Sequence, residues 1–327
     1  MAIVTPGAAR APRRRWLQAT SLAPLIALAV LFVISALASP YFLQVQNLLN
    51  ILRQVSYPGI VALGMTFVII GGGIDLSVGS MLALVGALSM SVLNATGGEL
   101  GSILLTIAVA LGLGAACGSF NGILITKGRI APFIVTLGTL AIFRSLTLYY
   151  GDAGEFRSIS ESYGDLGMSL VFAIPTPVWV WLLLAAALST LLNRTRYGRH
   201  VCAVGSNEKV AKYSAIAVDR VRLFTYVIAG LTVAVSSVLL SARLNSLSST
   251  NFGRDYELDS IAAVIIGGTP MSGGRGSIWG TVVGAIILGI INNMLNMLSV
   301  SPYLQGTVKG LVIVAAVFIQ RRSIRGD

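Results

Sequence analysis

The residues whose types and spacing could do chemistry lie first in a short glycine-rich stretch, residues 71–79 (GGGIDLSVG). Its three consecutive glycines permit backbone conformations that other residues resist. Asp75 and Ser77 follow at the point where a helix is expected to begin, and either side chain can cap free N–H groups there. A carboxylate inside an apolar span also indicates contact with a solute or a gate. Helix capping and solute contact are compatible, and the residues leave both open.

Amide side chains inside apolar spans form a second group of candidates. Asn292 and Asn296 are four residues apart and therefore share one face of a helix. Such amides hydrogen-bond between helices, each contributing about 0.6 kcal/mol, and they can equally line a path for a hydroxylated solute. The predicted substrate path therefore comprises Asp75, Ser77, Asn121, Asn292, Asn293 and Asn296.

A basic loop, residues 194–222, contains a predicted docking element. Ser206 or Asn207 can cap a two-turn helix from Glu208 to Ala215, whose first turn holds the acidic Glu208. Lys209 and Lys212 would lie on its exposed face, and the apolar residues 215–218 follow. A short helix with both charged and apolar surface is typical of a docking site for another protein. The alternative is an amphipathic helix that lies in the membrane interface.

Charged residues before the eighth apolar segment form a third candidate site. Arg243 and Arg254 lie with Asp255, Glu257 and Asp259 in a stretch that we expect outside the membrane. These charges indicate either a solvated cluster of ion pairs or a surface on which an external partner docks. Arg144, near the outer end of the fifth span, is interpreted as reaching to the membrane surface, with gating or a partner contact as the alternative.

The sequence offers few residues for catalysis, metal binding or disulfide formation. His200 is the only histidine, and the two cysteines give neither a disulfide framework nor the spacing of a metal site. We therefore expect no catalytic residues, no metal, no cofactor and no enzyme activity. No G-x-x-x-x-G-K-[ST] motif occurs, so any ATP that drives the chain must be bound by another polypeptide.

Composition indicates that the bilayer is the solvent of this chain. It is 55% hydrophobic and 11% charged, with a mean hydropathy of +0.83, whereas soluble domains carry about 25% charged residues. The net charge of +11 would suggest nucleic acid in a soluble protein. Here it is explained without nucleic acid, because cytoplasmic loops of membrane proteins collect lysine and arginine.

The elements that must position these residues are about ten transmembrane helices, which predicts an all-α polytopic membrane protein. The first apolar run, residues 17–38, is read as an uncleaved helix rather than a signal peptide, because it is long enough to span. The basic segments, which include 194–222, are expected inside and the acidic segment 151–168 outside, with both termini cytoplasmic. The predicted domains are a tail (1–16), a permease domain (17–320) and a tail (321–327). The ten predicted spans are Leu17–Ala38, Asn47–Ile70, Leu76–Leu93, Ser102–Thr126, Ala131–Tyr150, Ser169–Leu192, Leu223–Ala242, Ser260–Gly268, Gly276–Leu298 and Tyr303–Gln320.

Two abnormal spans carry an internal repeat. The second is expected to break at Pro58-Gly59, and the eighth has only about nine residues, fewer than the roughly 20 needed to cross. Both end in the letters VIIGG, at 68–72 and 264–268, and both precede a polar, glycine-rich stretch. Broken helices at corresponding places in two halves point to a substrate path. The predicted broken-helix loops contain Gly71, Gly72, Gly73, Gly267 and Gly268.

Several motifs in order along the chain resemble the ribose-type family of sugar ABC permeases. They are residues 72–79 (GGIDLSVG), 139–144 (TLAIFR), 203–208 (AVGSNE), 256–269 (YELDSIAAVIIGGT) and 273–281 (GGRGSIWGT). The resemblance runs from about Leu48 to Gln320. It implies a bacterial inner-membrane permease that imports a monosaccharide or a similar small polar solute by alternating access.

The resemblance also implies partners and the residues that meet them. A second permease subunit, identical or different, would form a dimer around the central path. Cytosolic ATP-binding subunits would dock on the family's coupling region, here Gly205, Asn207, Glu208, Lys212 and Ala215. A periplasmic sugar-binding protein would deliver the solute to the outer face, where Arg254, Asp255 and Glu257 are the candidate contacts. An ion-driven secondary transporter remains the alternative, since broken helices and repeats fit that class too.

Overall fold

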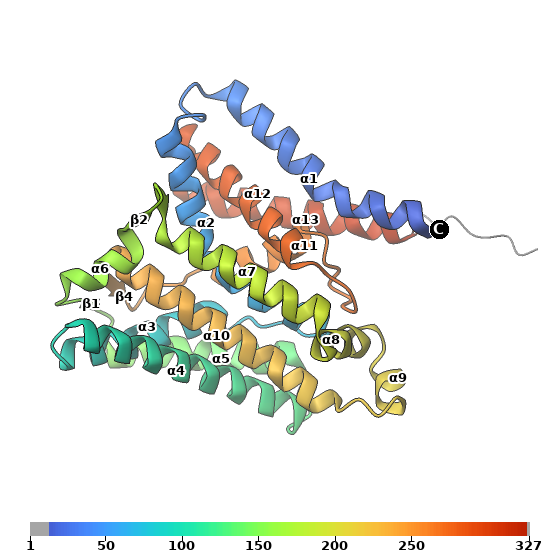
Figure 1. Ribbon diagram of the computed structural model, residues 1–327, viewed down its shortest axis with the longest axis horizontal. Helices are drawn as coiled ribbons and strands as arrows, with labels where there is room; N and C mark the ends of the chain where they lie inside the picture. The colour runs from blue at the N-terminus through green and yellow to red at the C-terminus, as the bar shows by residue number, and fades with distance from the viewer. Residues whose placement is uncertain (1–12, 326–327) are drawn as a thin grey trace, which may run out of the picture.

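The computed structural model describes residues 13–325, which are almost entirely helical (Figure 1). The helices are α1 (Arg13–Ala38), α2 (Val45–Ile70), α3 (Val78–Ala95), α4 (Leu100–Thr126), α5 (Pro132–Tyr150), α6 (Glu161–Met168), α7 (Thr176–Arg194), α8 (Arg196–Ser206), α9 (Glu208–Tyr213), α10 (Val218–Leu244), α11 (Tyr256–Ile266), α12 (Ile278–Met297) and α13 (Pro302–Arg325). Two short antiparallel pairs of strands complete the fold: β1 (Glu155–Arg157) with β4 (Ser246–Ser248), and β2 (Leu170–Val171) with β3 (Ile174–Pro175).

Seven helices in this part of the chain are long and apolar enough to cross a membrane: α2, α3, α4, α5, α7, α10 and α12. A helix also occupies each of the other three predicted spans, as α1, α11 and α13. The all-α polytopic class is thereby confirmed, whereas ten crossings stay a prediction. Residues 1–12 and 326–327, which belong to the two predicted tails, lie outside the described residues. The helices α1 and α13 extend beyond the predicted boundaries at residues 17 and 320.

Helices α2, α3 and α10 form the centre of the bundle and are the most deeply buried of the seven. Helix α10 packs on α4, α2 and α3, and α2 packs on α12, α11 and α7. The closest of these contacts uses glycine: a Cβ added at Gly114 or Gly118 of α4 would overlap the backbone of α10. Small residues spaced by four let helix backbones approach closely in a membrane, where apolar burial alone does not favour association.

Helix α2 does not break at Pro58-Gly59 as the sequence suggested, because it runs without interruption from Val45 to Ile70. A proline inside a helix removes one N–H donor and disturbs the preceding turn. Serine hydroxyls add hydrogen bonds around this turn: Ser56 Oγ donates to the Arg53 carbonyl at 2.7 Å, and Ser236 Oγ of α10 donates to the Tyr57 carbonyl at 2.9 Å. Polar side chains of this kind make proline tolerable in transmembrane helices.

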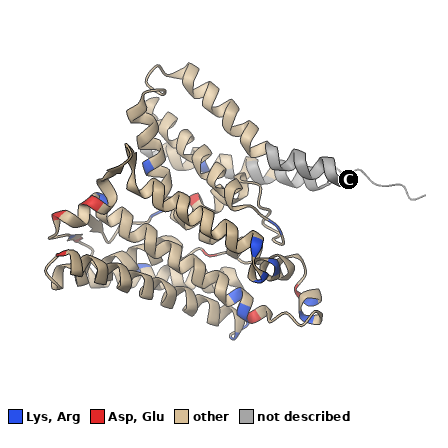
Figure 2. Ribbon diagram, viewed as in Figure 1, with Lys and Arg blue, Asp and Glu red and all other residues tan. Residues whose placement is uncertain are grey.

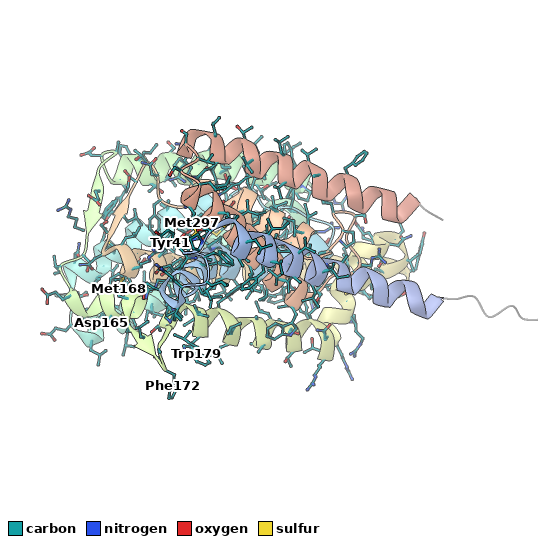
Figure 3. The ribbon with its side chains drawn as sticks, turned by 90° about the horizontal axis from the view of Figure 1, so that it is seen from above. Tyr41, Asp165, Met168, Phe172, Trp179 and Met297 are labelled. Carbon is teal, nitrogen blue, oxygen red and sulfur yellow. The ribbon has the colours of Figure 1, made fainter. Side chains whose placement is uncertain are left out.

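The sixth predicted span, from Ser169, also needs correction, because its helix α7 starts seven residues later at Thr176. Residues 170–175 form the β2–β3 hairpin instead. Pro175 and Pro177 explain the boundary, because proline fits the start of a helix but not its interior. Phe172 at the hairpin tip is 88% exposed and points away from the bundle on the same side as Trp179 (Figure 3).

The real break lies after α2, where residues 71–77 are not helical. At one end of this segment the Ile70 carbonyl accepts a hydrogen bond from Gly274 N, just beyond α11. At its other end Gly79 packs on the Gly253 carbonyl and on Glu257, at the start of α11. The segment therefore runs back along α11, whose 11 residues correspond to about 16 Å. It places irregular backbone inside the protein at membrane depth, where only protein or a cavity can surround it.

The two repeated segments run in the same direction. The first turn of α2 bonds to α12 through Asn47 and Asn293, and the last residue of α2 bonds to the loop before α12, so α2 is antiparallel to α12. Helix α11 also ends where α12 begins, since Gly267 packs on Gly280. Helices α2 and α11 are therefore parallel, and the repeat is parallel rather than inverted.

The ends of the bundle differ in charge (Figure 2). Lysine and arginine gather at the end formed by α8, α9 and the start of α10, whereas acidic side chains are found at the opposite end, around α6 and β1. This is the segregation that the loop charges predicted, and it is typical of a membrane protein whose basic end faces the cytoplasm.

Candidate functional site

A buried polar cluster forms where the irregular segment meets α4. The Asp75 carboxylate accepts hydrogen bonds from the backbone N–H of Ser77 at 2.9 Å and from its hydroxyl at 2.6 Å. The Asn121 amide nitrogen of α4 donates to the Ser77 hydroxyl at 2.8 Å and lies 3.5 Å from Asp75. All three residues are 0% exposed. Asp75 thus satisfies donors at the start of α3, and no solute can reach the cluster in this conformation.

The structure brings together only half of the predicted substrate path, because the amides of α12 lie elsewhere. Asn293 exchanges hydrogen bonds with Asn47 of α2, the shorter at 2.8 Å. Asn296 accepts from Gln305 of α13 at 2.8 Å. Asn292 lines a separate cavity, and its buried amide oxygen has no hydrogen-bond partner. The three α12 amides therefore bond to α2 and α13 or face this cavity, away from Asp75.

The two predicted broken-helix loops meet each other. Gly274 N donates to the Ile70 carbonyl at 2.8 Å, which joins the end of α2 to the loop after α11. Gly72 and Gly268 have φ angles of 78° and 90°, which only glycine adopts without strain. Gly205, at the end of α8, packs directly on the Ile70 carbonyl, where a Cβ would overlap it. Glycine is thus required where three chain segments cross.

The predicted docking helix exists but is shorter than expected. Helix α9 covers Glu208–Tyr213, and the Asn207 side chain caps it by accepting from Val210 N at 3.1 Å. It stops before Ala215 because that residue has a left-handed φ of 57° and its amide turns back to the Lys212 carbonyl. Tyr213 is 90% exposed and Val210 56% exposed, so the free face is partly apolar.

Glu208 ties this short helix to α10. Its carboxylate pairs with Lys212 at 2.6 Å and with Arg222 of α10 at 3.0 Å. Hydrogen bonds from Lys212 and Arg222 hold the pKa of Glu208 below its ordinary value. A groove of about 650 Å³ lies beside this pair, bounded by the loop between α4 and α5. Lys212 is therefore engaged by Glu208, and Lys209 is the lysine of α9 without a described ion pair.

Sequence reasoning missed the residues that connect the docking helix to the irregular segment. Tyr226 donates its hydroxyl to the Ile74 carbonyl at 3.1 Å. It lies four residues after Arg222, so one face of α10 touches both α9 and the backbone beside Asp75. The signal in the sequence was an arginine and a tyrosine spaced by four at the basic start of an apolar helix.

The charged residues just before α11 and in its first turn line a hollow of about 360 Å³. Arg254, Asp255 and Glu257 border it, together with Arg144 and Ser80. Among the described residues, none of these charges forms an ion pair within 4.0 Å, so they are not a cluster of paired ions. Arg144 donates to the carbonyls of Ser249 and Phe252 at 3.2 and 3.0 Å, which fixes the loop before α11 rather than reaching to the surface.

In the described part of the chain, no group of three histidine, cysteine, aspartate or glutamate side chains is placed to hold a metal ion. The arrangement suits a moving gate. The polar cluster is closed, and the surface helix α9 is connected to it through α10 and to the crossing glycine loops through the end of α8.

Comparisons with known proteins place the chain among transport permeases. A family model described as "Branched-chain amino acid transport system / permease component" matches residues 47–317. The ribose import permease protein of Bacillus subtilis (strain 168) is 45% identical over 305 residues, which cover 92% of each chain. That of Escherichia coli (strain K12) is 42% identical over 302 residues, covering 91% of this chain and 92% of its own. The L-arabinose transport system permease protein of Escherichia coli (strain K12) is 36% identical over 298 residues, covering 91% and 89%. No solved structure matches the chain.

Proposed function

The chain belongs to the family of branched-chain amino acid transport system permease components, and from that premise we propose that it is the membrane-spanning subunit of an ABC importer for a monosaccharide. The observation that carries the proposal is the identity of 42–45% with ribose import permeases across nine-tenths of both chains. Its family is one of transport permeases rather than enzymes. Nothing in the relatives' names favours an ion-driven transporter, the class that the broken helices left open.

The ATP that drives transport is hydrolysed by separate subunits, which dock on α9. The exposed side chains of Val210 and Tyr213 offer apolar contact area at the basic end of the bundle. Exposed aromatic residues surrounded by charge are typical of a protein contact surface. The ion pairs of Glu208 fix the orientation of this surface relative to α10.

Docking then moves the gate through direct contacts. The residues just before α9 touch both glycine loops, since Gly205 packs on Ile70 and Ser206 Oγ lies 3.4 Å from the Gly274 carbonyl. A shift of α9 is therefore passed to the ends of α2 and α11. Arg222 and Tyr226 pass the same shift along α10 to the backbone beside Asp75. Packed interfaces change between discrete arrangements, so small shifts at the surface produce larger ones inside.

The solute path runs past the polar groups that this movement uncovers. Asp75, Ser77 and Asn121 are its closed inner gate, with Asn293 and Asn296 of α12 as further lining. A periplasmic sugar-binding protein docks at the outer hollow bordered by Arg254 and Glu257. A second permease subunit completes the path in the inner membrane, and both termini lie in the cytoplasm.

The test is a pull-down of the tagged chain from solubilised native membranes, with identification of the proteins that accompany it. We expect a Walker-motif ATPase with the wild type, and a loss of most of it with Glu208→Arg or Tyr213→Ala. The matched control is Glu155→Arg, which removes an ion pair of 3.4 Å at the opposite end of the bundle. The proposal is wrong if the chain purifies alone and carries solute in liposomes on an ion gradient without ATP.

A further inference from the structure

A half-open cavity lined by both polar and apolar residues lies between helices of the subunit, apart from the proposed gate. It has a volume of about 260 Å³, room for about nine water molecules at roughly 30 Å³ each. Residues of α2, α10, α11 and α12 line it. Its polar lining consists of Gln54, Tyr57, Arg243, Tyr256, Asp259 and Asn292. None of these residues contacts Asp75, Ser77 or Asn121.

Two buried polar groups of this cavity form no hydrogen bond of good geometry within the described residues. Tyr57 is 1% exposed, and its hydroxyl lies near the Arg243 guanidinium without a hydrogen bond of good geometry between them. The buried amide oxygen of Asn292 has none either. Buried polar groups in proteins are nearly always hydrogen-bonded, so two in one cavity indicate a missing occupant.

The charges around the cavity do not balance. The guanidinium of Arg243 lies 5.5 Å from the centre of the Tyr57 ring and, within residues 13–325, has no carboxylate within 4.0 Å. The one carboxylate in the lining, Asp259, is already paired with Lys309 of α13 at 2.9 Å. Arg53, one turn before Tyr57 on α2, adds a second guanidinium whose buried Nε has no partner.

The Arg243 side chain is half-buried and has no counter-ion among the described residues, so it can attract an anion into this cavity. Arginine presents several N–H donors in a planar fork that matches carboxylate and phosphate oxygens. The Tyr57 hydroxyl can donate to the same oxygens, and the unpartnered Asn292 amide oxygen, which only accepts, can bind the hydroxyl of a protonated phosphate. We propose that this cavity binds an oxyanion, a phosphate or carboxylate group held between Arg243 and Tyr57.

The proposal goes beyond the import function and is tested on the permease alone. Purified protein in maltoside detergent is titrated calorimetrically with inorganic phosphate, at an ionic strength held constant with chloride. We expect saturable binding that weakens about tenfold or more in Arg243→Gln, since tenfold corresponds to about 1.4 kcal/mol, near the low end for a charge-assisted hydrogen bond. Tyr57→Phe keeps the ring and removes only the hydroxyl, so it tests the site even if the arginine variant folds poorly.

The matched control is Arg157→Gln, whose side chain is 81% exposed at the outer end and which should bind phosphate as the wild type does. Equal binding by Arg243→Gln, Tyr57→Phe and wild type overturns the proposal, and so does saturable binding of neutral ribose in place of phosphate.

Native mass spectrometry separates the two sources of an oxyanion. A phospholipid that accompanies the wild type, is displaced by phosphate and is lost from Arg243→Gln assigns the site to a lipid headgroup. Phosphate binding without such a lipid assigns it to a soluble anion. Absence of both rejects the oxyanion site, while leaving the pull-down of the ATPase unaffected.

Discussion

Gly205→Ala tests whether the α8–α9 segment transmits movement to the membrane. A Cβ at this position would overlap the Ile70 carbonyl and lie 2.7 Å from the Gly274 backbone nitrogen. Both neighbours are backbone, so no side chain can rotate away. Ordinary contact begins at 3.4 Å, so relieving the Gly274 contact alone needs a shift of about 0.7 Å, and the closer Ile70 carbonyl requires the segment to move further.

The expected size of the effect follows from overpacking, which costs about 1–3 kcal/mol. If about 1.4 kcal/mol of this cost falls on one of two transport conformations, their ratio changes about tenfold. We expect solute uptake to fall by that factor and the thermal unfolding midpoint to decrease. The ATPase should still accompany the variant, because the exposed face of α9 is unchanged.

The assay compares uptake by cells in which the variant replaces the native permease, with a pull-down of the ATPase from the same membranes. Gly112→Ala is the matched control, since a Cβ there meets nothing within 4 Å. Wild-type uptake and stability in Gly205→Ala would refute the tight crossing and the route of transmission. Loss of the ATPase together with uptake would show that the residue acts in docking instead.

Three further predictions follow from the contacts around the gate. Asp75→Ala should lower the free energy of unfolding by about 1–3 kcal/mol, because two donors of Ser77 lose their acceptor. Asp75→Asn keeps an acceptor oxygen and should lower the free energy of unfolding by less. Thermal unfolding in detergent measures both variants. Tyr226→Phe should reduce uptake while retaining the ATPase, because only the bond to the loop carbonyl is lost. The fold lowers the pKa of Glu208, so the ionised carboxylate stabilises the folded protein. This contribution is complete above about pH 4.3, the pKa of free glutamate, and is lost as the pH falls through the lower pKa of the folded state. The difference in unfolding midpoint between wild type and Glu208→Gln should therefore be constant at neutral pH and shrink in acid.

Much of this fold could be predicted from short stretches of sequence, because the length and hydropathy of a segment are enough to indicate a membrane helix. The helix α3 and its unusual start were predictable from glycines followed by Asp75 and Ser77. The cap of α9 by Asn207 was predictable for the same reason, since short polar side chains at helix starts satisfy free N–H groups locally. These features depend on neighbours in the sequence.

Other features depended on partners far along the chain. Pro58 looked like a break, and the hydroxyl of Ser236 that helps to accommodate it lies on another helix. The α12 amides looked like part of one path, yet Asn293 bonds to Asn47, 246 residues away. Such pairings follow from helix packing, which periodicity does not encode.

The contact of Tyr226 with the Ile74 carbonyl bears on how the protein is made. The hydroxyl that satisfies this carbonyl is encoded 152 residues later. At 5–20 residues per second, ribosomes need roughly 8–30 s to supply it. During that interval residues 71–77 lack their α10 partner inside the bilayer, where an unsatisfied backbone group is costly. Biogenesis therefore requires water or an insertion chaperone to shelter this segment, and chains truncated before α10 should be preferred substrates of membrane quality-control proteases.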